Sequence, residues 1–126
     1  MTKYLSNYDN LKDRYNQQVS NELKMNDISA TEGQVTVVNQ APIKVSVKIQ
    51  GIQVEQIIIQ VAGLKTPLYD TVFMALEASL QCASINFYNA YQKAVRTRTT
   101  QIGQAKGVQA IHQVNANQLI VTLTRK

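Results

Sequence analysis

The alternation of apolar and polar residues between Ile43 and Gln50 constrains the fold of this chain more than any other feature. The apolar set is Ile43, Val45, Val47 and Ile49, and the polar residues between them are Lys44, Ser46, Lys48 and Gln50. A period of two is typical of a β-strand with one face buried. A tight turn at Gln50-Gly51 predicts a hairpin that pairs Ile49 with Ile52, Val47 with Val54 and Ile43 with Ile58. Farther from the turn, Ile57, Ile59 and Val61 fall on the opposite face, so we expect that end to be covered on both sides.

Similar patterns predict three more strands. A short strand runs from Val35 to about Asn39, and Ala41-Pro42 breaks the chain after it. Near the C-terminus, Val108 to Val114 and Leu119 to Thr124 alternate in the same way around a turn at residues 115–117. These two segments form a closing hairpin.

A long helix is expected from Thr66 to about Val95, with Thr66 as N-cap and Pro67 at the first helical position. Its core stripe is Tyr69, Val72, Phe73, Leu76, Leu80, Ala83, Phe87, Ala90, Tyr91 and Ala94. A second apolar strip runs along the opposite side and consists of Met74, Ala78, Cys82, Ile85 and Tyr88. A helix that is apolar on two sides must be covered on two sides, by the N-terminal helix or by a second copy of the protein.

The N-terminal segment predicts an amphipathic helix from about Lys3 to Met25. Its narrow stripe is rich in tyrosine and consists of Tyr4, Tyr8, Leu11, Tyr15, Val19 and Leu23. Tyrosine suits a half-wet contact, because its ring is apolar and its hydroxyl can still reach water. We therefore expect this helix to dock on a surface rather than to sit at the centre of a core.

These elements predict a two-layer α+β fold in the order α-β-β-β-α-β-β. The expected sheet has five strands and is mostly antiparallel, with the one long helix packed across it. The 126 residues suit one domain, in which residues 1–27 form the N-terminal docking helix and residues 33–126 form the sheet and the long helix.

Over residues 4–97, the order α-β-β-β-α resembles that of the double-stranded-RNA-binding domain family. The resemblance implies a basic cluster at the start of the second helix. Here that position reads Lys65-Thr66-Pro67-Leu68-Tyr69-Asp70, a single lysine followed by an aspartate. The charge pattern departs from that of the family, so the resemblance concerns the fold alone.

Charge is distributed unevenly along the chain. Glu77 is the last acidic residue, and the 49 residues after it carry six basic ones, so that this stretch has a charge of +6 against +5 for the whole chain. A half of one sign faces nucleic acid, a phosphate-bearing ligand or an acidic partner. In a predicted loop from Thr97 to Gly107, Arg96, Arg98 and Lys106 could cradle a phosphate. The alternative is a surface loop whose bases only favour the C-terminus of the helix.

A basic sheet face is a second candidate for phosphate binding. Lys44 and Lys48 lie on the exposed side of their strand, and Lys106, Arg125 and Lys126 could reach the same side. Such a face could follow a phosphate backbone, but it lacks the aromatic residues that stack on bases. Binding would therefore be sensitive to salt and almost indifferent to sequence.

No constellation for catalysis or metal binding is present in the sequence. His112 is the single histidine and Cys82 the single cysteine, so neither an intrachain disulfide nor a Cys/His zinc site can form. We expect no enzyme activity and no cofactor. There is no secretory h-region and no run of about 20 apolar residues, so we expect no membrane partner and a location in the cytoplasm or in a particle assembled there.

The sequence favours a structural, assembling subunit of a homo-oligomer. The 15 Gln and 10 Asn residues suit hydrogen-bonded subunit contacts, although an AT-rich genome would also favour Asn codons. The expected interface comprises Met74, Ala78, Cys82, Ile85 and Tyr88 of the long helix and Tyr4, Tyr8, Leu11 and Tyr15 of the N-terminal helix. A ring, tube or shell component of a phage or mobile element fits this description. The alternative is a small module that binds nucleic acid or a phosphate ligand without sequence preference.

Overall fold

The computed structural model describes residues 3–29 and 31–126. Within these residues the chain forms three α-helices and a seven-stranded antiparallel sheet. The strands are β1 (Ser6–Asn7), β2 (Glu32–Gln40), β3 (Ile43–Gln50), β4 (Gln53–Val61), β5 (Gln101–Ala105), β6 (Val108–Asn115) and β7 (Gln118–Arg125). The helices are α1 (Tyr8–Asn16), α2 (Pro67–Leu80) and α3 (Ile85–Thr97), with a short 3₁₀ turn, η1 (Asn21–Leu23). The mixed α+β class is confirmed, and four predicted details are wrong.

The sheet consists of two meanders joined at its centre. Its order is β2-β3-β4-β7-β6-β5, so β4 of the first meander pairs with β7 of the second. The pairing of β7 with β4 ends at Thr124 and Gln56. The short strand β1 takes over the same edge of β4 beyond that point, where Ser6 pairs with Val54. The two ends of the described chain consequently meet, and Lys3 Nζ donates a hydrogen bond to the backbone oxygen of Lys126 at 3.1 Å.

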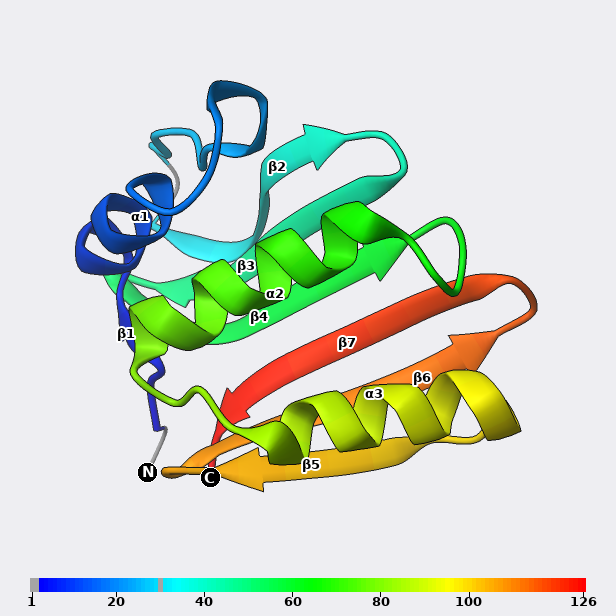
Figure 1. The fold of residues 1–126 in the computed structure, drawn as a ribbon. Coiled ribbons are helices and arrows are strands. Elements are labelled where there is room, and N and C mark those ends of the chain that lie inside the picture. Colours follow the sequence, from blue (N-terminus) through cyan, green and yellow to red (C-terminus); the bar gives the residue numbers. More distant parts are fainter. Residues whose placement is uncertain (1–2, 30) are drawn as a thin grey trace.

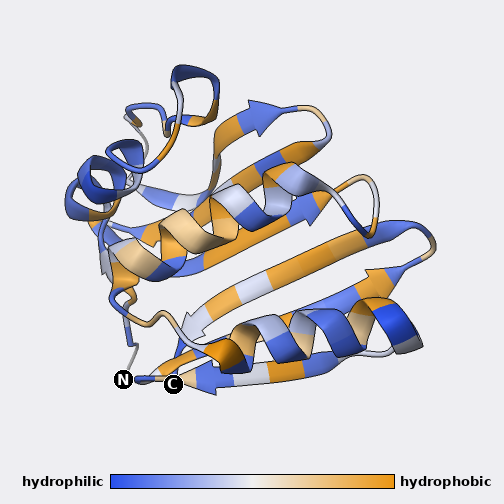
Figure 2. Ribbon diagram, in the orientation of Figure 1, coloured by the Kyte–Doolittle hydropathy of each residue, from blue (hydrophilic) through white to orange (hydrophobic). Residues whose placement is uncertain are grey.

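All three helices lie on one face of the sheet (Figure 1). The α2 helix crosses in front of β3 and β4, and α3 runs along β5 and β6 (Figure 1). One row of the core crosses four neighbouring strands through Val47, Ile57, Leu123 and Ala110. Apolar colour is concentrated along β3, β4 and β7, whereas α1 and the loop after it are largely hydrophilic (Figure 2).

The β3–β4 hairpin is confirmed, but its predicted register is wrong. The two turn residues are Gly51 and Ile52, so Gln50 pairs with Gln53 and Ile49 with Val54. Gly51 adopts a φ of +62°, which glycine tolerates without strain. A β-bulge then inserts Glu55, and this extra residue reverses the side-chain phase of the strand. Ile57, Ile59 and Val61 therefore face the helices, and Ile58 points to the opposite side.

The prediction of a single long helix is also wrong, because a non-helical link separates α2 from α3. Gln81 ends α2 in the left-handed conformation, and Ser84 caps α3 by accepting a hydrogen bond from the Asn86 N–H at 3.1 Å. Glu77 spans the break, since its carboxylate accepts a hydrogen bond from the Ser84 N–H at 3.0 Å. The predicted core stripe is buried at every position except Ala83, which lies in the link. The two short helices thus bury the same face that one long helix would have buried.

A strand replaces the predicted loop after α3. Residues Gln101–Ala105 form the edge strand β5, and Lys106-Gly107 form a tight turn with positive φ angles into β6. Gly103 lies at the middle of β5 against the first turn of α3, where a side chain would meet the helix backbone. With β1 and β5 added, the sheet exceeds the predicted five strands.

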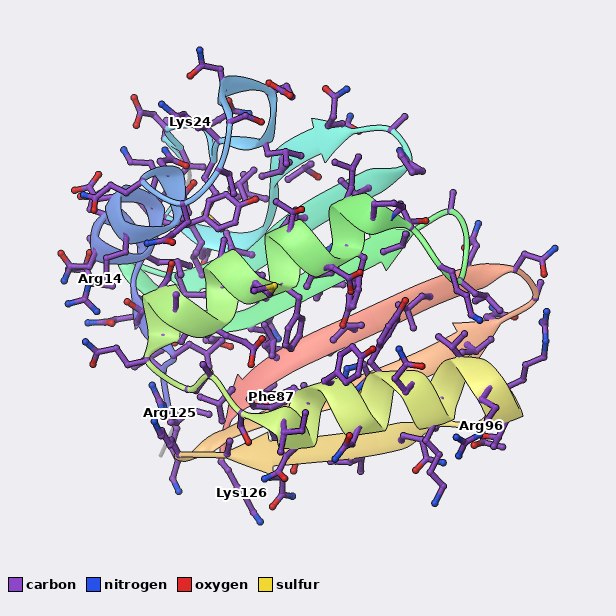
Figure 3. All side chains as sticks on the ribbon, in the orientation of Figure 1. Arg14, Lys24, Phe87, Arg96, Arg125 and Lys126 are labelled. Carbon is purple, nitrogen blue, oxygen red and sulfur yellow. The ribbon has the colours of Figure 1, made fainter. Side chains whose placement is uncertain are left out.

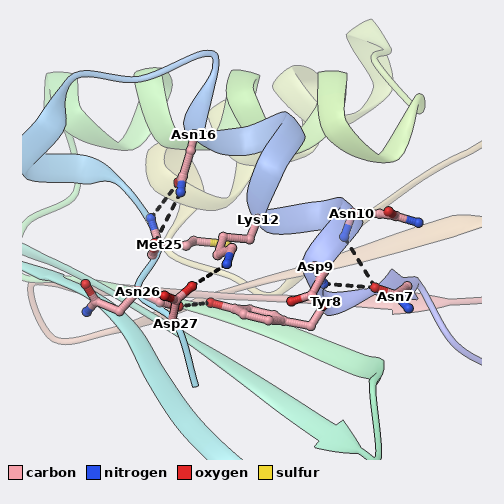
Figure 4. Close-up of polar contacts among 9 residues, drawn as sticks. All are labelled: Asn7, Tyr8, Asp9, Asn10, Lys12, Asn16, Met25, Asn26 and Asp27. Carbon is pink, nitrogen blue, oxygen red and sulfur yellow. Dashed lines mark hydrogen bonds and ion pairs between the residues drawn. The ribbon is translucent and has the colours of Figure 1, made fainter. Parts of the chain in front are cut away.

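The N-terminal helix is shorter than predicted and is not a surface docking element. Asn7 caps α1 with its side chain, which accepts from the Asp9 and Asn10 N–H groups. After α1 the chain turns back, and the Asn16 side chain bonds to both the N–H and the carbonyl of Met25 (Figure 4). The buried residues of this segment belong to the main core and are Leu5, Tyr8, Leu11, Tyr15, Leu23 and Met25.

Candidate functional site

The sheet face opposite the helices is not covered by any element of the described residues (Figure 1). Its central row follows the strand register across β3, β4, β7, β6 and β5. The members of this row are Ser46, Ile58, Thr122, Ile111 and Ile102. Ile102 is 54% exposed, and Ile58 and Ile111 are half-buried. With the half-buried Ile120 of β7, these three isoleucines form what we call the isoleucine stripe.

Polar rows flank the isoleucine stripe on both sides. One row runs through Lys48, Gln56, Thr124, Gln109 and Gln104. The other runs through Lys44, Gln60 and Gln113 and is interrupted at β7 by Ile120 of the stripe. Gln104 donates to the Gln109 side-chain oxygen at 3.0 Å and accepts from Lys126 Nζ at 2.6 Å. Lys48 Nζ lies 3.9 Å from the Glu55 carboxylate. The face therefore combines a branched apolar centre with amides, hydroxyls and a few lysines.

The predicted basic residues do not gather into one patch. Lys44 and Lys48 lie on the uncovered face, and Lys126 reaches it through Gln104. Arg96 lies at one end of α3, whereas Arg125 and Lys126 lie at the opposite end of the sheet (Figure 3). The basic half of the sequence is thus divided between two ends of the molecule.

Two of the predicted phosphate ligands are engaged within the chain. Arg125 donates to the backbone oxygens of Tyr4 and Leu5 at 3.2 and 2.9 Å, and to that of Lys106 at 3.4 Å. Arg98 donates to the Ala116 carbonyl at 2.8 Å, so it holds the β6–β7 turn. The loop expected to cradle a phosphate is the strand β5. The prediction of a phosphate cradle at Arg96, Arg98 and Lys106 therefore loses the loop on which it rests.

The predicted interface residues are divided between the core and the surface. Met74, Ala78, Ile85 and Tyr88 are exposed on the two helices. Cys82 is only 1% exposed, and burial raises the pKa of its thiol to about 11. Tyr8, Leu11 and Tyr15 are buried, and Tyr4 is half-buried with its hydroxyl 3.2 Å from the Gln50 side-chain oxygen. The four exposed helix residues thus remain candidates for an interface, and the buried ones are occupied inside the chain.

His112 is enclosed in the aromatic core between the sheet and the helices. Its ring is fully buried, 6.1 Å from the Phe73 ring and 6.5 Å from the Tyr91 ring, and neither nitrogen forms a well-aligned hydrogen bond. Burial lowers the His112 pKa to about 4, and nearby backbone groups of Gln101 and Ala110 offset part of this lowering. The imidazole is therefore neutral near pH 7 and has no acidic partner in contact.

Within residues 3–29 and 31–126, no three His, Cys, Asp or Glu side chains come together in a way that could hold a metal ion. None of the helices in this part of the chain has the length and apolar character needed to cross a membrane.

Sequence reasoning missed the isoleucine stripe for two physical reasons. The bulge at Glu55 turned Ile58 outward, and the residues that contain Ile102 were expected to form a loop. A signal did exist in the closing hairpin, where Ile111 and Ile120 occupy the outward phase of their strands. An outward isoleucine on two neighbouring strands indicates a second apolar face.

Comparison with known proteins does not identify a function. No protein-family model, curated protein or solved structure matched this chain.

Proposed function

We propose that this protein is a non-enzymatic subunit of a homo-oligomer, and that two copies pack through their uncovered sheet faces. The observation that carries the proposal is the isoleucine stripe, which crosses four strands at the centre of that face. A sheet with apolar residues on both faces is normally covered on both. In this chain the helices cover one face, so the partner supplies the second layer.

The size of the face is adequate for a stable dimer. Six strands spaced about 4.8 Å apart and about 26 Å long give a flat area of roughly 600 Å². Pleating and side chains increase the accessible area, which brings it near the roughly 800 Å² per partner of a standard interface. A second copy therefore fits this face without any additional element.

The arrangement of side chains favours a two-fold axis parallel to the strands. The antiparallel pair β4–β7 lies at the centre of the sheet, so such an axis would place β3 of one copy over β6 of the other. Lys44 and Lys48 would then face Gln109 and Gln113 of the second copy rather than its lysines. Lysine and glutamine already pair in this way within the chain, between Lys126 and Gln104. This arrangement keeps the lysines of the two copies apart and gives them side-chain oxygens to bind.

A particle such as a ring, tube or shell needs a second contact beyond this pair. Ala78 and Ile85 are exposed on the helix side of the molecule and are available for it. A subunit with two different contact surfaces can extend an assembly, whereas one isologous contact closes a dimer. We propose that such a particle belongs to a phage or a related mobile element.

A second candidate function is nucleic-acid binding by the same face. The observation that favours it is the presence of Lys44, Lys48 and Lys126 on or at that face in a chain with a net charge of +5. Without aromatic residues in its rows, the face would bind the phosphate backbone alone. Binding would then fall steeply with salt, whereas pairing through the isoleucine stripe would not.

The mass of the purified protein distinguishes these functions. Light scattering on a chromatography column should give a dimer or larger species without nucleic acid, and the species should persist at high ionic strength. Ile111→Lys places a charge at the centre of the stripe and should shift the mass to that of a monomer. Asn89→Lys on the exposed side of α3 introduces the same charge outside the stripe and is the matched control, which should leave the mass unchanged.

A monomer in the native protein would refute the pairing. A monomer that carries nucleic acid, released by salt and lost in the Lys44→Gln, Lys48→Gln double variant, would instead establish the second candidate. Ile102→Lys changes the most exposed residue of the stripe and repeats the test if Ile111→Lys perturbs the fold.

A further inference from the structure

A groove between α2 and α3 lies on the helix side of the molecule, away from the proposed pairing face. It consists of two adjoining hollows of about 290 and 320 Å³, which share Asp70, Tyr88 and Tyr91. Together they fall within the size range of small-ligand sites. We call the smaller one the aromatic hollow.

The walls of the aromatic hollow are largely aromatic. The Tyr69 and Tyr91 rings stack with their centroids 4.7 Å apart, and Phe73 lies 5.5 Å from Tyr69. Tyr88 and Met74 also line the hollow and are 52% and 67% exposed, so they can close over a bound group without rearrangement of the core. Such walls favour a ligand with a flat or branched apolar body.

The charge at the hollow is negative, although the chain as a whole is positive. Asp70 and Glu77 are the charged residues among those that line it, and Lys65 lines only the second hollow. Asp70 makes no salt bridge with any residue of the described part of the chain. The pKa of Tyr69 is raised mainly by burial, and further by Tyr91, Asp70 and Glu77. The two carboxylates among these neighbours, Asp70 and Glu77, oppose a negative charge and favour a positive one.

The Tyr69 hydroxyl is buried and does not form part of the accessible surface of the hollow. The Tyr69 side chain lines the aromatic hollow and is only 3% exposed, yet its hydroxyl has no hydrogen-bond partner among the described residues. An unpaired buried hydroxyl costs stability unless another group satisfies it. The ring of Tyr69, rather than its oxygen, is therefore the part that a ligand in the hollow contacts.

We propose that the α2–α3 groove binds a small organic cation, an ammonium or guanidinium group on an apolar body. The body lies against Phe73, Met74 and Tyr88, and the charge lies near Asp70. Aromatic faces attract cations directly, so the same walls serve both parts of the ligand. This site does not depend on the pairing of sheet faces.

The test compares two probes of nearly equal shape, 2-phenylethylammonium and the neutral 2-phenylethanol. Each is titrated into isotopically labelled protein, and the amide shifts of α2 and α3 are followed by NMR. The ammonium should bind with a Kd on the order of 1 mM, as expected for nine heavy atoms, and about threefold or more tightly than the alcohol. Tyr88→Ala should weaken the binding of both probes.

Asp70→Asn should abolish the preference for the cation, and Asp13→Asn on the exposed side of α1 is the matched control that should not. In the native protein, high ionic strength should weaken the binding of the ammonium probe and leave the binding of the alcohol unchanged. This comparison repeats the test without a substitution. Equal binding of the two probes, or shifts located away from α2 and α3, would overturn the proposal. Loss of sheet-face pairing would leave this result unaffected, so the two proposals fail separately.

Discussion

Gly103 lies directly beneath Phe87, so close that a β-carbon on the glycine would stand 3.2 Å from Phe87 Cα. The same β-carbon would be 3.0 Å from the backbone oxygen of Asn86. This contact lets α3 approach β5, and the Asn86 side chain reinforces it by donating to the Gln104 carbonyl at 2.9 Å. The edge of the sheet and α3 are therefore held together at a position where a β-carbon would be in tight contact with the helix backbone.

Gly103→Ala should destabilise the protein by about 1–3 kcal/mol, because the added methyl group meets backbone atoms that cannot rotate away. Urea unfolding followed by circular dichroism would measure the change. Gln104→Ala, at the exposed neighbouring position, should cost less than about 0.5 kcal/mol. A Gly103→Ala variant as stable as the native protein would show that α3 can shift without loss.

Arg125→Met should release the N-terminal segment from the sheet. The guanidinium binds the Tyr4 and Leu5 carbonyls, and losing both bonds should cost about 1–3 kcal/mol. The Leu5 and Tyr8 N–H groups, which donate to Val54 and Ile52, should then exchange with solvent faster than the rest of β4. Lys126→Ala should leave their exchange unchanged. If the Leu5 and Tyr8 N–H groups exchange as slowly in Arg125→Met as in the native protein, β1 holds the segment without the arginine.

His112 should make the stability of the protein depend on pH. Its pKa is about 4 when folded and 6.5 when unfolded, so the unfolded chain binds more protons between these values. Stability is therefore lost as the pH falls, by about 2 kcal/mol between pH 7 and pH 5 from this residue alone. In His112→Leu this contribution disappears, and the decline over the same range should be shallower. Parallel declines in the two proteins would show that the imidazole can be protonated in the folded state.

The strand pattern predicted much of the fold, because alternation reports local burial directly. The β3–β4 and β6–β7 hairpins lie where Ile43 to Val61 and Val108 to Thr124 indicated. The break between α2 and α3 was missed because the apolar stripe continues through it, while Ser84 and the left-handed Gln81 are weak local signals. The hydrogen bond from the Ser84 N–H to the Glu77 carboxylate spans that break, and the apolar pattern does not report it.

The candidate site could be predicted only in part. Lys44 and Lys48 were placed on the exposed face by their alternation, and that placement is observed. The isoleucine stripe depends on a single inserted residue, Glu55, and on an edge strand in a segment whose glycine and hydroxyl residues suggested a loop. A bulge changes the face of every later residue in the strand, and no periodic pattern reports it in advance.

The most direct test of the proposed pairing is the reactivity of individual lysines as the protein is concentrated. Lys44 and Lys48 lie on the uncovered face, and Lys24 is exposed beside the N-terminal segment, well away from it (Figure 3). Acetylation followed by mass spectrometry should show that Lys44 and Lys48 become protected as dimers form, while Lys24 reacts at a constant rate. Ile111→Lys should remove the protection. Unchanged reactivity of Lys44 and Lys48 across the transition to dimer would contradict the account.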